Sequence, residues 1–180
     1  MSRVFLGLGS NIERERYIVA GLDALQRLFG VFEHSSVYDS AAIGFQGQPF
    51  LNLVVGLETD LAVAELARQL RLIEVEHGRP EHATRFSARQ LDLDILTYDD
   101  RVGVVDRVVL PRGEILENAF VLQPLAELAP DNLHPVSKQS YARLWQAYDK
   151  QAQQLARVDF SWRGRLISQA GPSPGSPEGA

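Results

Sequence analysis

Residues 89–96, with the sequence RQLDLDIL, constrain the fold of this chain more than any other stretch. Leu91, Leu93 and Ile95 alternate with two aspartates, and successive residues of a β-strand point to opposite faces of a sheet. One face of this stretch is therefore apolar enough to lie under helices, while the other face carries two carboxylates. The pattern predicts a strand whose acidic face is either solvated or binds a cation.

The elements before this strand predict a fold class. Apolar periodicity and breaker residues indicate, in order, a strand at 4–8, a helix ending at Gly30, strands at 31–38 and 50–59, a helix ending at Gly78, and the acidic strand at 90–98. This β-α-β-β-α-β order is typical of an α+β, ferredoxin-like sandwich, in which two helices cover one face of an antiparallel sheet. We expect loops or ligands to cover the other face.

The remaining residues predict additions to this sandwich. Residues 102–110 are β-prone and would form a hairpin extension, and helices are expected at 114–128 and 137–156. Residues 1–168 would form a single domain. The Pro/Gly/Ser-rich tail at 169–180 has too little apolar surface to order itself, so we expect it to be disordered.

Composition excludes several classes of function. The net charge of -5 and pI of about 5.4 provide no overall basic field for nucleic acid or an anionic membrane. Without cysteine, thiolate metal sites and cysteine nucleophiles are impossible. No apolar run approaches a membrane span, and the first one is too short for a signal peptide. We therefore expect a soluble, cytoplasmic protein with no nucleic-acid or membrane partner. We also expect a monomer, although composition does not address this point.

The acidic pair is a candidate metal site. Asp92 and Asp94 would project side by side and repel one another unless a cation lies between them. Mg²⁺ suits such a pair, because it is commonly bound by one or two carboxylates, water and substrate phosphate oxygens. The alternative is a strand with one solvated face. Glycosyltransferases and nucleases also use acidic pairs, so the pattern alone does not select one reaction.

Three arginines lie just upstream of the acidic strand. Arg79, Arg85 and Arg89 concentrate positive charge there in an otherwise acidic chain. A guanidinium can donate two hydrogen bonds at once to a phosphate, so the cluster is typical of a triphosphate site. The alternative is a set of surface ion pairs. No P-loop motif is present, so a nucleotide would be held by metal and side chains.

Other residues could recognise a flat ligand. Asn52 interrupts the apolar stretch FLNLVV, where an amide could bind a heterocycle or simply lie on a solvated strand face. Phe50 shares the face of Asn52. Phe86 and Phe120 are further aromatics that could stack on a planar ligand or belong to the core.

Several motifs together resemble one enzyme family. They are GLGSN at 7–11, FLNLVVGLET at 50–59, IEVEHGR at 73–79, RFSARQLDLDIL at 85–96 and AFVLQPLAELAP at 119–130. In this order they are similar to 6-hydroxymethyl-7,8-dihydropterin pyrophosphokinases, and they cover most of residues 3–135. The resemblance implies the ferredoxin-like fold and Mg-ATP-dependent transfer of pyrophosphate to the hydroxymethyl group of the pterin, with release of AMP, in folate biosynthesis.

The resemblance also implies roles for individual residues. Two Mg²⁺ ions would be bound by Asp92 and Asp94, which with Arg79 and Arg89 would act in catalysis. The pterin would contact Ser40, Ala41, Ile43, Phe50, Asn52 and Phe120. ATP would contact Arg71, Glu74, Arg85, Phe86, Arg89 and Arg112.

This chain departs from the family pattern on the phosphate side. Arg112 stands where the family has histidine, Asn118 where it has arginine, and Phe86 where it usually has tryptophan. These changes motivate an alternative, a divergent paralogue that binds a pterin or nucleotide with weak or altered transfer. A non-catalytic ferredoxin-like RNA-binding module is a third reading. It calls for a basic sheet face with stacking aromatics, which the acidic pI and acidic strand oppose.

Overall fold

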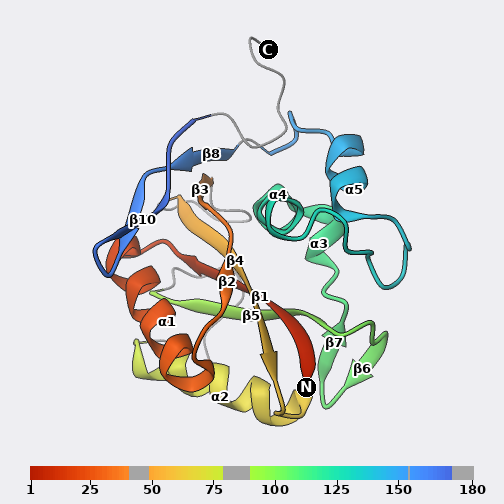
Figure 1. The fold of residues 1–180 in the computed structure, drawn as a ribbon, viewed down its shortest axis with the longest axis horizontal. Helices are drawn as coiled ribbons and strands as arrows, with labels where there is room; N and C mark the ends of the chain where they lie inside the picture. Colours follow the sequence, from red (N-terminus) through yellow and green to blue (C-terminus); the bar gives the residue numbers. More distant parts are fainter. Residues whose placement is uncertain (41–48, 79–89, 154, 172–180) are drawn as a thin grey trace.

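The computed structural model describes residues 1–40, 49–78, 90–153 and 155–171. Its strands are β1 (Ser2–Ser10), β2 (Glu33–His34), β3 (Val37–Ser40), β4 (Phe50–Thr59), β5 (Asp92–Tyr98), β6 (Gly103–Val105), β7 (Val108–Leu110), β8 (Leu155–Val158), β9 (Phe160–Trp162) and β10 (Arg165–Ser168). Its helices are α1 (Arg14–Phe29), α2 (Val63–Glu76), α3 (Glu114–Glu117), α4 (Ala119–Leu128) and α5 (Tyr141–Ala147). Figure 1 shows their arrangement.

The main sheet has the order expected of a ferredoxin-like fold. Its strands follow one another as β5-β1-β4-β3-β8, with the short β2 also paired to β4. Each of these pairings is antiparallel. The predicted α+β class and antiparallel sheet are confirmed, and the acidic strand β5 lies beside the glycine-containing β1.

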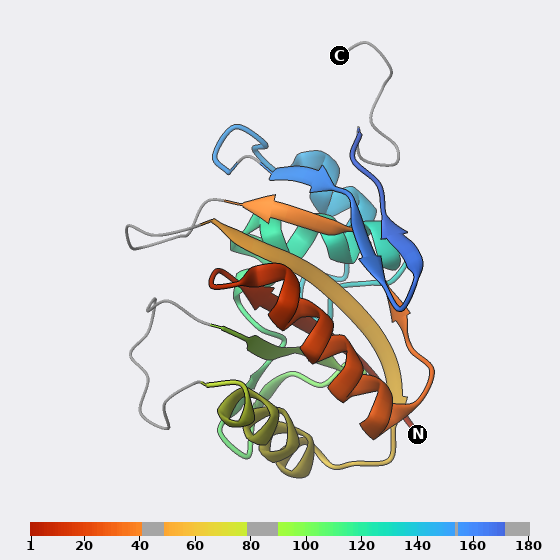
Figure 2. The same cartoon turned by 90° about the vertical axis from the view of Figure 1, so that its left-hand side faces the viewer.

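Helices α1 and α2 cover one face of this sheet, as Figure 2 shows. Leu91, Leu93 and Ile95 are buried there together with Leu66 and Leu70 of α2. The apolar side chains of the acidic strand therefore lie on the face predicted for them. This packing leaves the two aspartates on the opposite face of β5.

The opposite face is covered partly by protein, which corrects the expectation of loops or ligands alone. Helix α4 packs on β4 and β3. Phe5, Val54 and Leu96 of the sheet form a second buried cluster with the residues of α4 and with Tyr141. The expectation failed because α4 is largely apolar and buries most of its surface, so it supplies its own layer.

The predicted strand at 31–38 is in fact two short strands. The hydroxyl of Ser35 accepts a hydrogen bond from the Val54 backbone N–H at 3.0 Å, and Glu127 accepts from the backbone N–H of Ser36 at 2.8 Å. Glu127 also accepts from the Tyr38 hydroxyl at 3.0 Å. Side chains thus replace part of the strand pairing, which separates β2 from β3.

The helices after β7 are shorter than predicted. The stretch expected at 114–128 is divided by Asn118, whose backbone is extended, with φ -117° and ψ 124°. The helix expected at 137–156 spans only α5. Residues 155–158 instead form β8, which pairs with β3 at the sheet edge. Pairing with an available edge outweighed local helix propensity there.

Two hairpins complete the structure. The pair β6 and β7 forms the extension predicted from residues 102–110, whereas the hairpin of β9 and β10 was not predicted. Asp23 of α1 fastens the latter by accepting hydrogen bonds from Trp162 and Arg163, each at 2.9 Å.

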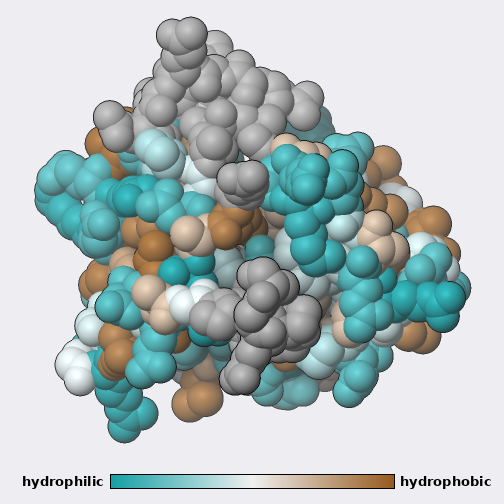
Figure 3. All heavy atoms as spheres, turned by 90° about the horizontal axis from the view of Figure 1, so that it is seen from above, coloured by the Kyte–Doolittle hydropathy of each residue, from teal (hydrophilic) through white to brown (hydrophobic). Residues whose placement is uncertain are grey.

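Figure 3 views the surface from above, where the described residues show hydrophobic patches between hydrophilic side chains. None of the helices in the described ranges combines the length and hydrophobicity that a membrane crossing needs.

Candidate active site

The acidic pair lies beside two glycines in the sheet. Asp92 is opposite Gly9 of β1, and Asp94 is opposite Gly7. Because glycine has no side chain, the sheet next to each carboxylate is bare. The side chain of Asp94 keeps 28% of its surface exposed. Burial raises the pKa of Asp94 well above its ordinary value, and the negative charge of Asp92 raises it further. A cation between these carboxylates would remove that repulsion.

The donor set suits a metal that keeps part of its water. Within the described ranges, no three or more His, Asp or Glu side chains gather as a metal site. A metal held by the Asp92 and Asp94 pair would therefore need further oxygen ligands from water or a substrate. Mg²⁺ has this preference and is usually completed by phosphate oxygens.

Arg112, two residues after the end of β7, lies next to Asp94 of the acidic pair. Its backbone N–H donates to the Leu96 carbonyl at 2.9 Å, which fixes the start of the side chain. Nη1 lies 3.6 Å from Asp94 Oδ1, while Nη2 donates to Glu114 Oε1 at 2.7 Å. Burial lowers the pKa of Arg112, but the charges of Asp94 and Glu114 outweigh burial and raise it overall. Arg112 is therefore a fixed cation at the acidic pair.

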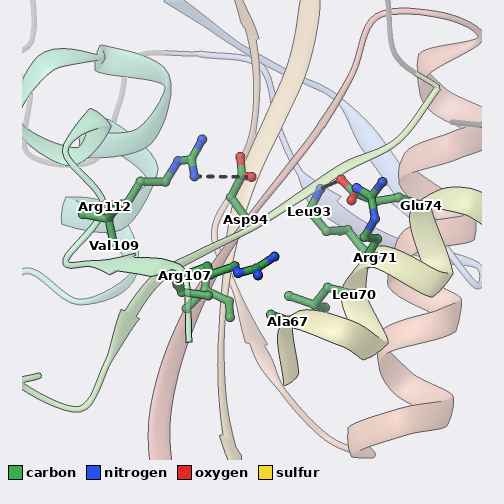
Figure 4. Close-up of a pocket in the computed structure, with 11 residues that line it drawn as sticks. Ala67, Leu70, Arg71, Glu74, Leu93, Asp94, Arg107, Val109 and Arg112 are labelled. Atoms are coloured by element: carbon green, nitrogen blue, oxygen red, sulfur yellow. Dashed lines mark hydrogen bonds and ion pairs between the residues drawn. The ribbon is translucent and has the colours of Figure 1, made fainter. Parts of the chain in front are cut away.

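A cavity of about 280 Å³ opens beside Asp94, between α2, β5 and the β6–β7 hairpin. Its walls are partly apolar, and its charged lining is Arg71, Glu74, Asp94, Arg107 and Arg112, as Figure 4 shows. Apolar walls with a few charged groups are typical of a small-molecule site.

Glu74 both lines this cavity and connects α2 to β5. The residue is 5% exposed, and its Oε2 accepts a hydrogen bond from the Leu93 backbone N–H at 2.9 Å. One carboxylate oxygen thus fixes β5 against α2, and the residue also lines the cavity. This position is compatible with the expected contact to ATP, which stays a prediction.

Arg107 is a cavity residue that the sequence did not single out. Asp106 and Arg107 have φ values of 49° and 70°, as a type I′ two-residue hairpin turn requires. The turn brings Arg107 into the cavity lining, across from α2 (Figure 4). The available signal was a two-residue polar break between β-prone stretches, but nothing local showed that the hairpin folds back over α2.

The residues expected to bind the pterin lie on the next strands. Asn52 of β4 is opposite Gly9 and 7% exposed, and its Nδ2 donates to the Ser40 hydroxyl at 2.8 Å. Ser40 is opposite Phe50 where β3 and β4 pair. Phe120 lies in the first turn of α4, which packs on β4. The structure therefore brings Asn52, Ser40 and Phe50 together.

Arg14 was also missed by the sequence analysis. It forms a two-pronged ion pair with Asp39, at 2.9 and 2.8 Å, and donates to the Pro49 carbonyl at 3.1 Å. Arg14 thus connects β3, through Asp39, to Pro49, just before the start of β4. The predictions for Ala41, Ile43, Arg79, Arg85, Phe86 and Arg89 fall outside the described residues.

The fold and the site define an α+β, ferredoxin-like protein in which one aspartate of an acidic pair lines a cavity together with three arginines, an arrangement suited to transfer of a phosphate-containing group. The family model of 7,8-dihydro-6-hydroxymethylpterin-pyrophosphokinase (HPPK) matches residues 5–130. The chain belongs to this family.

Two relatives agree with this assignment. The chain is 36% identical over 138 residues to 2-amino-4-hydroxy-6-hydroxymethyldihydropteridine pyrophosphokinase of Aquifex aeolicus, covering 76% of this chain and 86% of that one. It is 41% identical over 135 residues to the protein of the same name from Pseudomonas aeruginosa, covering 73% and 83%.

The solved wild-type HPPK-DHPS of Plasmodium falciparum matches with a TM-score of 0.67 at 12% identity. The match covers 93% of this chain and 50% of that chain. This similarity supports the fold alone.

Proposed function

We propose that this chain transfers pyrophosphate from Mg-ATP to the hydroxymethyl group of 6-hydroxymethyl-7,8-dihydropterin and releases AMP, as a step of folate biosynthesis. One observation carries the proposal. Gly9 is flanked in the sheet by Asn52 on one side and Asp92 on the other. Two strand spacings of about 4.8 Å separate these side chains, so a pterin at Asn52 would place its substituent near a metal at Asp92.

The cavity next to Asp94 is the proposed site of ATP. Its apolar residues would contact the nucleoside, and Arg112 beside Asp94 would donate to phosphate oxygens. Arg107 and Arg71 line the same cavity and are further candidates for contacts to the nucleotide. This placement would orient the triphosphate toward the acidic pair and hence toward the pterin.

The acidic pair would bind Mg²⁺, and we propose two ions. Asp92 and Asp94 fit this role because they project from one face of β5 beside bare glycines and repel each other without a cation. Bound Mg²⁺ would supply charge stabilisation for the phosphates in the transition state. The protein's part is to hold the carboxylates fixed, which the hydrogen bond from the Leu93 backbone N–H to Glu74 of α2 supports.

The reaction forms one bond and breaks one. The hydroxymethyl oxygen attacks the β-phosphorus, the bond from that phosphorus to the α,β-bridging oxygen breaks, and AMP leaves with the bridging oxygen. The hydroxyl proton passes to water. Asn52 would hold the pterin so that its hydroxymethyl group approaches in line, and Arg112 would balance the negative charge of the phosphates.

A single chain supplies the acidic pair, the cavity and the pterin-side residues. We therefore propose that a monomer is sufficient for activity. Sedimentation and specific activity, measured over the same range of protein concentrations, test this point. An obligate oligomer would show activity only at concentrations where it assembles.

The test of the function is AMP release from Mg-ATP with and without 6-hydroxymethyl-7,8-dihydropterin. We expect AMP only when the pterin is present, in an amount equal to the pyrophosphorylated pterin. Pterin binding without AMP would instead favour a divergent paralogue that binds the pterin but does not transfer pyrophosphate efficiently. The presence of Arg112 and Asn118 in place of the family's usual residues is the reason to test this outcome.

A further inference from the structure

A chain of contacts connects the C-terminal part of the protein to the acidic pair. Gln153 donates from Nε2 to Asn118 Oδ1 at 2.8 Å, and Asn118 donates from Nδ2 to Glu114 Oε2 at 3.3 Å. Glu114 Oε1 accepts from both Nε and Nη2 of Arg112, at 3.1 and 2.7 Å. The Arg112 Nη1 then lies 3.6 Å from Asp94. Apart from Arg112 and Asp94, the residues of this chain of contacts, Gln153, Asn118 and Glu114, are not among the substrate contacts proposed above.

The direction of these hydrogen bonds is set by one backbone group. The Ala119 N–H, at the start of α4, donates to Gln153 Oε1 at 2.9 Å. An amide oxygen must accept there, so Gln153 has only its NH₂ group to offer to Asn118. Asn118 must accept that bond through its oxygen, which leaves its own NH₂ group for Glu114. The backbone of α4 thus orients two amides in succession.

The hydrogen bonds from Arg112 to Glu114 determine how the guanidinium is oriented toward Asp94. An arginine free to move would form a two-pronged ion pair with a carboxylate, which is the stronger geometry. Here Glu114 occupies the Nε and Nη2 side of the guanidinium, and only Nη1 is directed at Asp94. Arg112 is thereby held near the acidic pair without covering it, so that metal and phosphate can bind.

We propose that Gln153, Asn118 and Glu114 are positioning residues that hold Arg112 for the phosphates of ATP. This inference rests on the proposed function, since it assumes that the triphosphate lies at Asp94. It gives the segment between α5 and β8 a role in nucleotide affinity. It also explains how this chain uses an asparagine at a position where the resemblance led us to expect an arginine.

The test is Gln153→Glu, which is nearly isosteric. A carboxylate at 153 still accepts from the Ala119 N–H but cannot donate to Asn118. Asn118 would then turn its NH₂ group to residue 153 and present its oxygen to Glu114, where two acceptors repel. Gln151→Glu is the matched control, because Gln151 lies two residues away, is exposed and receives the same charge change.

Calorimetry would measure binding of a non-hydrolysable α,β-methylene ATP analogue with Mg²⁺, and separately binding of the pterin. We expect Gln153→Glu to weaken analogue binding about 3- to 10-fold, the range for loss of one net hydrogen bond. Pterin binding should stay within about 2-fold, since the bond to the start of α4 is retained. Gln151→Glu should change neither.

A double-mutant cycle separates positioning from a general effect of charge or stability. In an Arg112→Ala background, Gln153→Glu should have almost no further effect on analogue binding, because the two residues act through one contact. Effects that add, or an unchanged affinity in Gln153→Glu, would overturn the inference while leaving the proposed function intact. A wild-type protein that binds pterin but not the analogue would overturn both.

Discussion

Gly9 stands opposite Asn52 where β1 pairs with β4, and a Cβ on Gly9 would lie 2.9 Å from the Asn52 Oδ1. That distance is too short for a side chain to fit without moving the amide. The same Cβ would also lie 3.5 Å from a ring carbon of Phe50. Gly9, within the GLGSN motif, therefore keeps the sheet bare between the pterin-side amide of Asn52 and the carboxylate of Asp92.

We expect Gly9→Ala to weaken pterin binding by about 10-fold or more, because the displaced amide loses one or two hydrogen bonds to the ligand. Gly7→Ala is the matched control on the same strand, since its Cβ would meet only the Leu96 side chain at 3.5 Å, an ordinary contact. Calorimetric titration of both variants with the pterin checks this. Equal losses in the two variants would contradict a specific role for the space at Gly9.

Replacing Asp94 should separate function from stability. We expect Asp94→Asn to lower turnover roughly 100-fold or more, because the proposed Mg²⁺ site would lose one of its two carboxylate ligands. The negative charge that develops on the phosphates would then be stabilised less. Thermal unfolding should occur at the same or a higher temperature, because burial and Asp92 both disfavour the charged carboxylate. Asp100→Asn, an exposed turn residue just beyond β5, is the control. Near-normal turnover of Asp94→Asn would rule out the metal assignment.

Arg107 should contribute to nucleotide binding. Arg107→Ala removes a cation from the cavity lining, so we expect the KM for ATP to rise about 3- to 10-fold with little change in the KM for pterin. Arg101 belongs to the loop that leads into the same hairpin, is exposed and lies over the ring of Tyr98, outside the cavity. Steady-state kinetics of Arg101→Ala should match the wild type. A larger effect at Arg101 than at Arg107 would contradict this placement of the nucleotide.

His134 should make stability depend on pH. This buried residue accepts at Nδ1 from the backbone N–H groups of Val136 and Ser137, at 3.2 and 3.1 Å. Burial lowers its pKa below the ordinary 6.5. As the pH falls below 6.5, the unfolded chain binds a proton more readily than the folded one, so the free energy of unfolding decreases.

His134→Asn provides the comparison, since an Asn Oδ1 can accept the same two bonds and does not titrate. Urea unfolding at pH 7.5 and 5.5 should show that acidification destabilises the wild type more than His134→Asn. Identical losses in the two proteins would show that His134 is not the source.

The strands of this fold could be predicted where one residue type alternates with another. The alternation around Asp92 and Asp94 correctly indicated which face would be buried, because a two-residue period has only one consistent orientation over a core. The helix predicted at 137–156 was too long for the opposite reason, since only α5 forms there and residues 155–158 belong to β8. Its local pattern favours a helix, yet pairing of β8 with β3 is a long-range interaction that leaves no local signal.

The site residues also divide into those with a local sequence signal and those that depend on long-range contacts. Asn52 and the acidic pair could be singled out from the sequence because polar residues within apolar strands stand out, whereas Ser40 was expected only from the family resemblance. Arg107 and Glu114 could not, since their importance depends on how a hairpin and a short helix fold back toward α2 and β5. Gln153 is separated from Asn118 by 35 positions, and its contact arises only from the tertiary fold.

The most direct test of pyrophosphate transfer follows the phosphorus atoms of ATP. ATP labelled separately at the α-, β- and γ-phosphates would be incubated with Mg²⁺, the pterin and the wild-type protein. We expect the β- and γ-labels to appear together in the pterin product and the α-label in AMP. Formation of ADP with only the γ-label in the pterin, or release of label without any pterin product, would contradict pyrophosphate transfer.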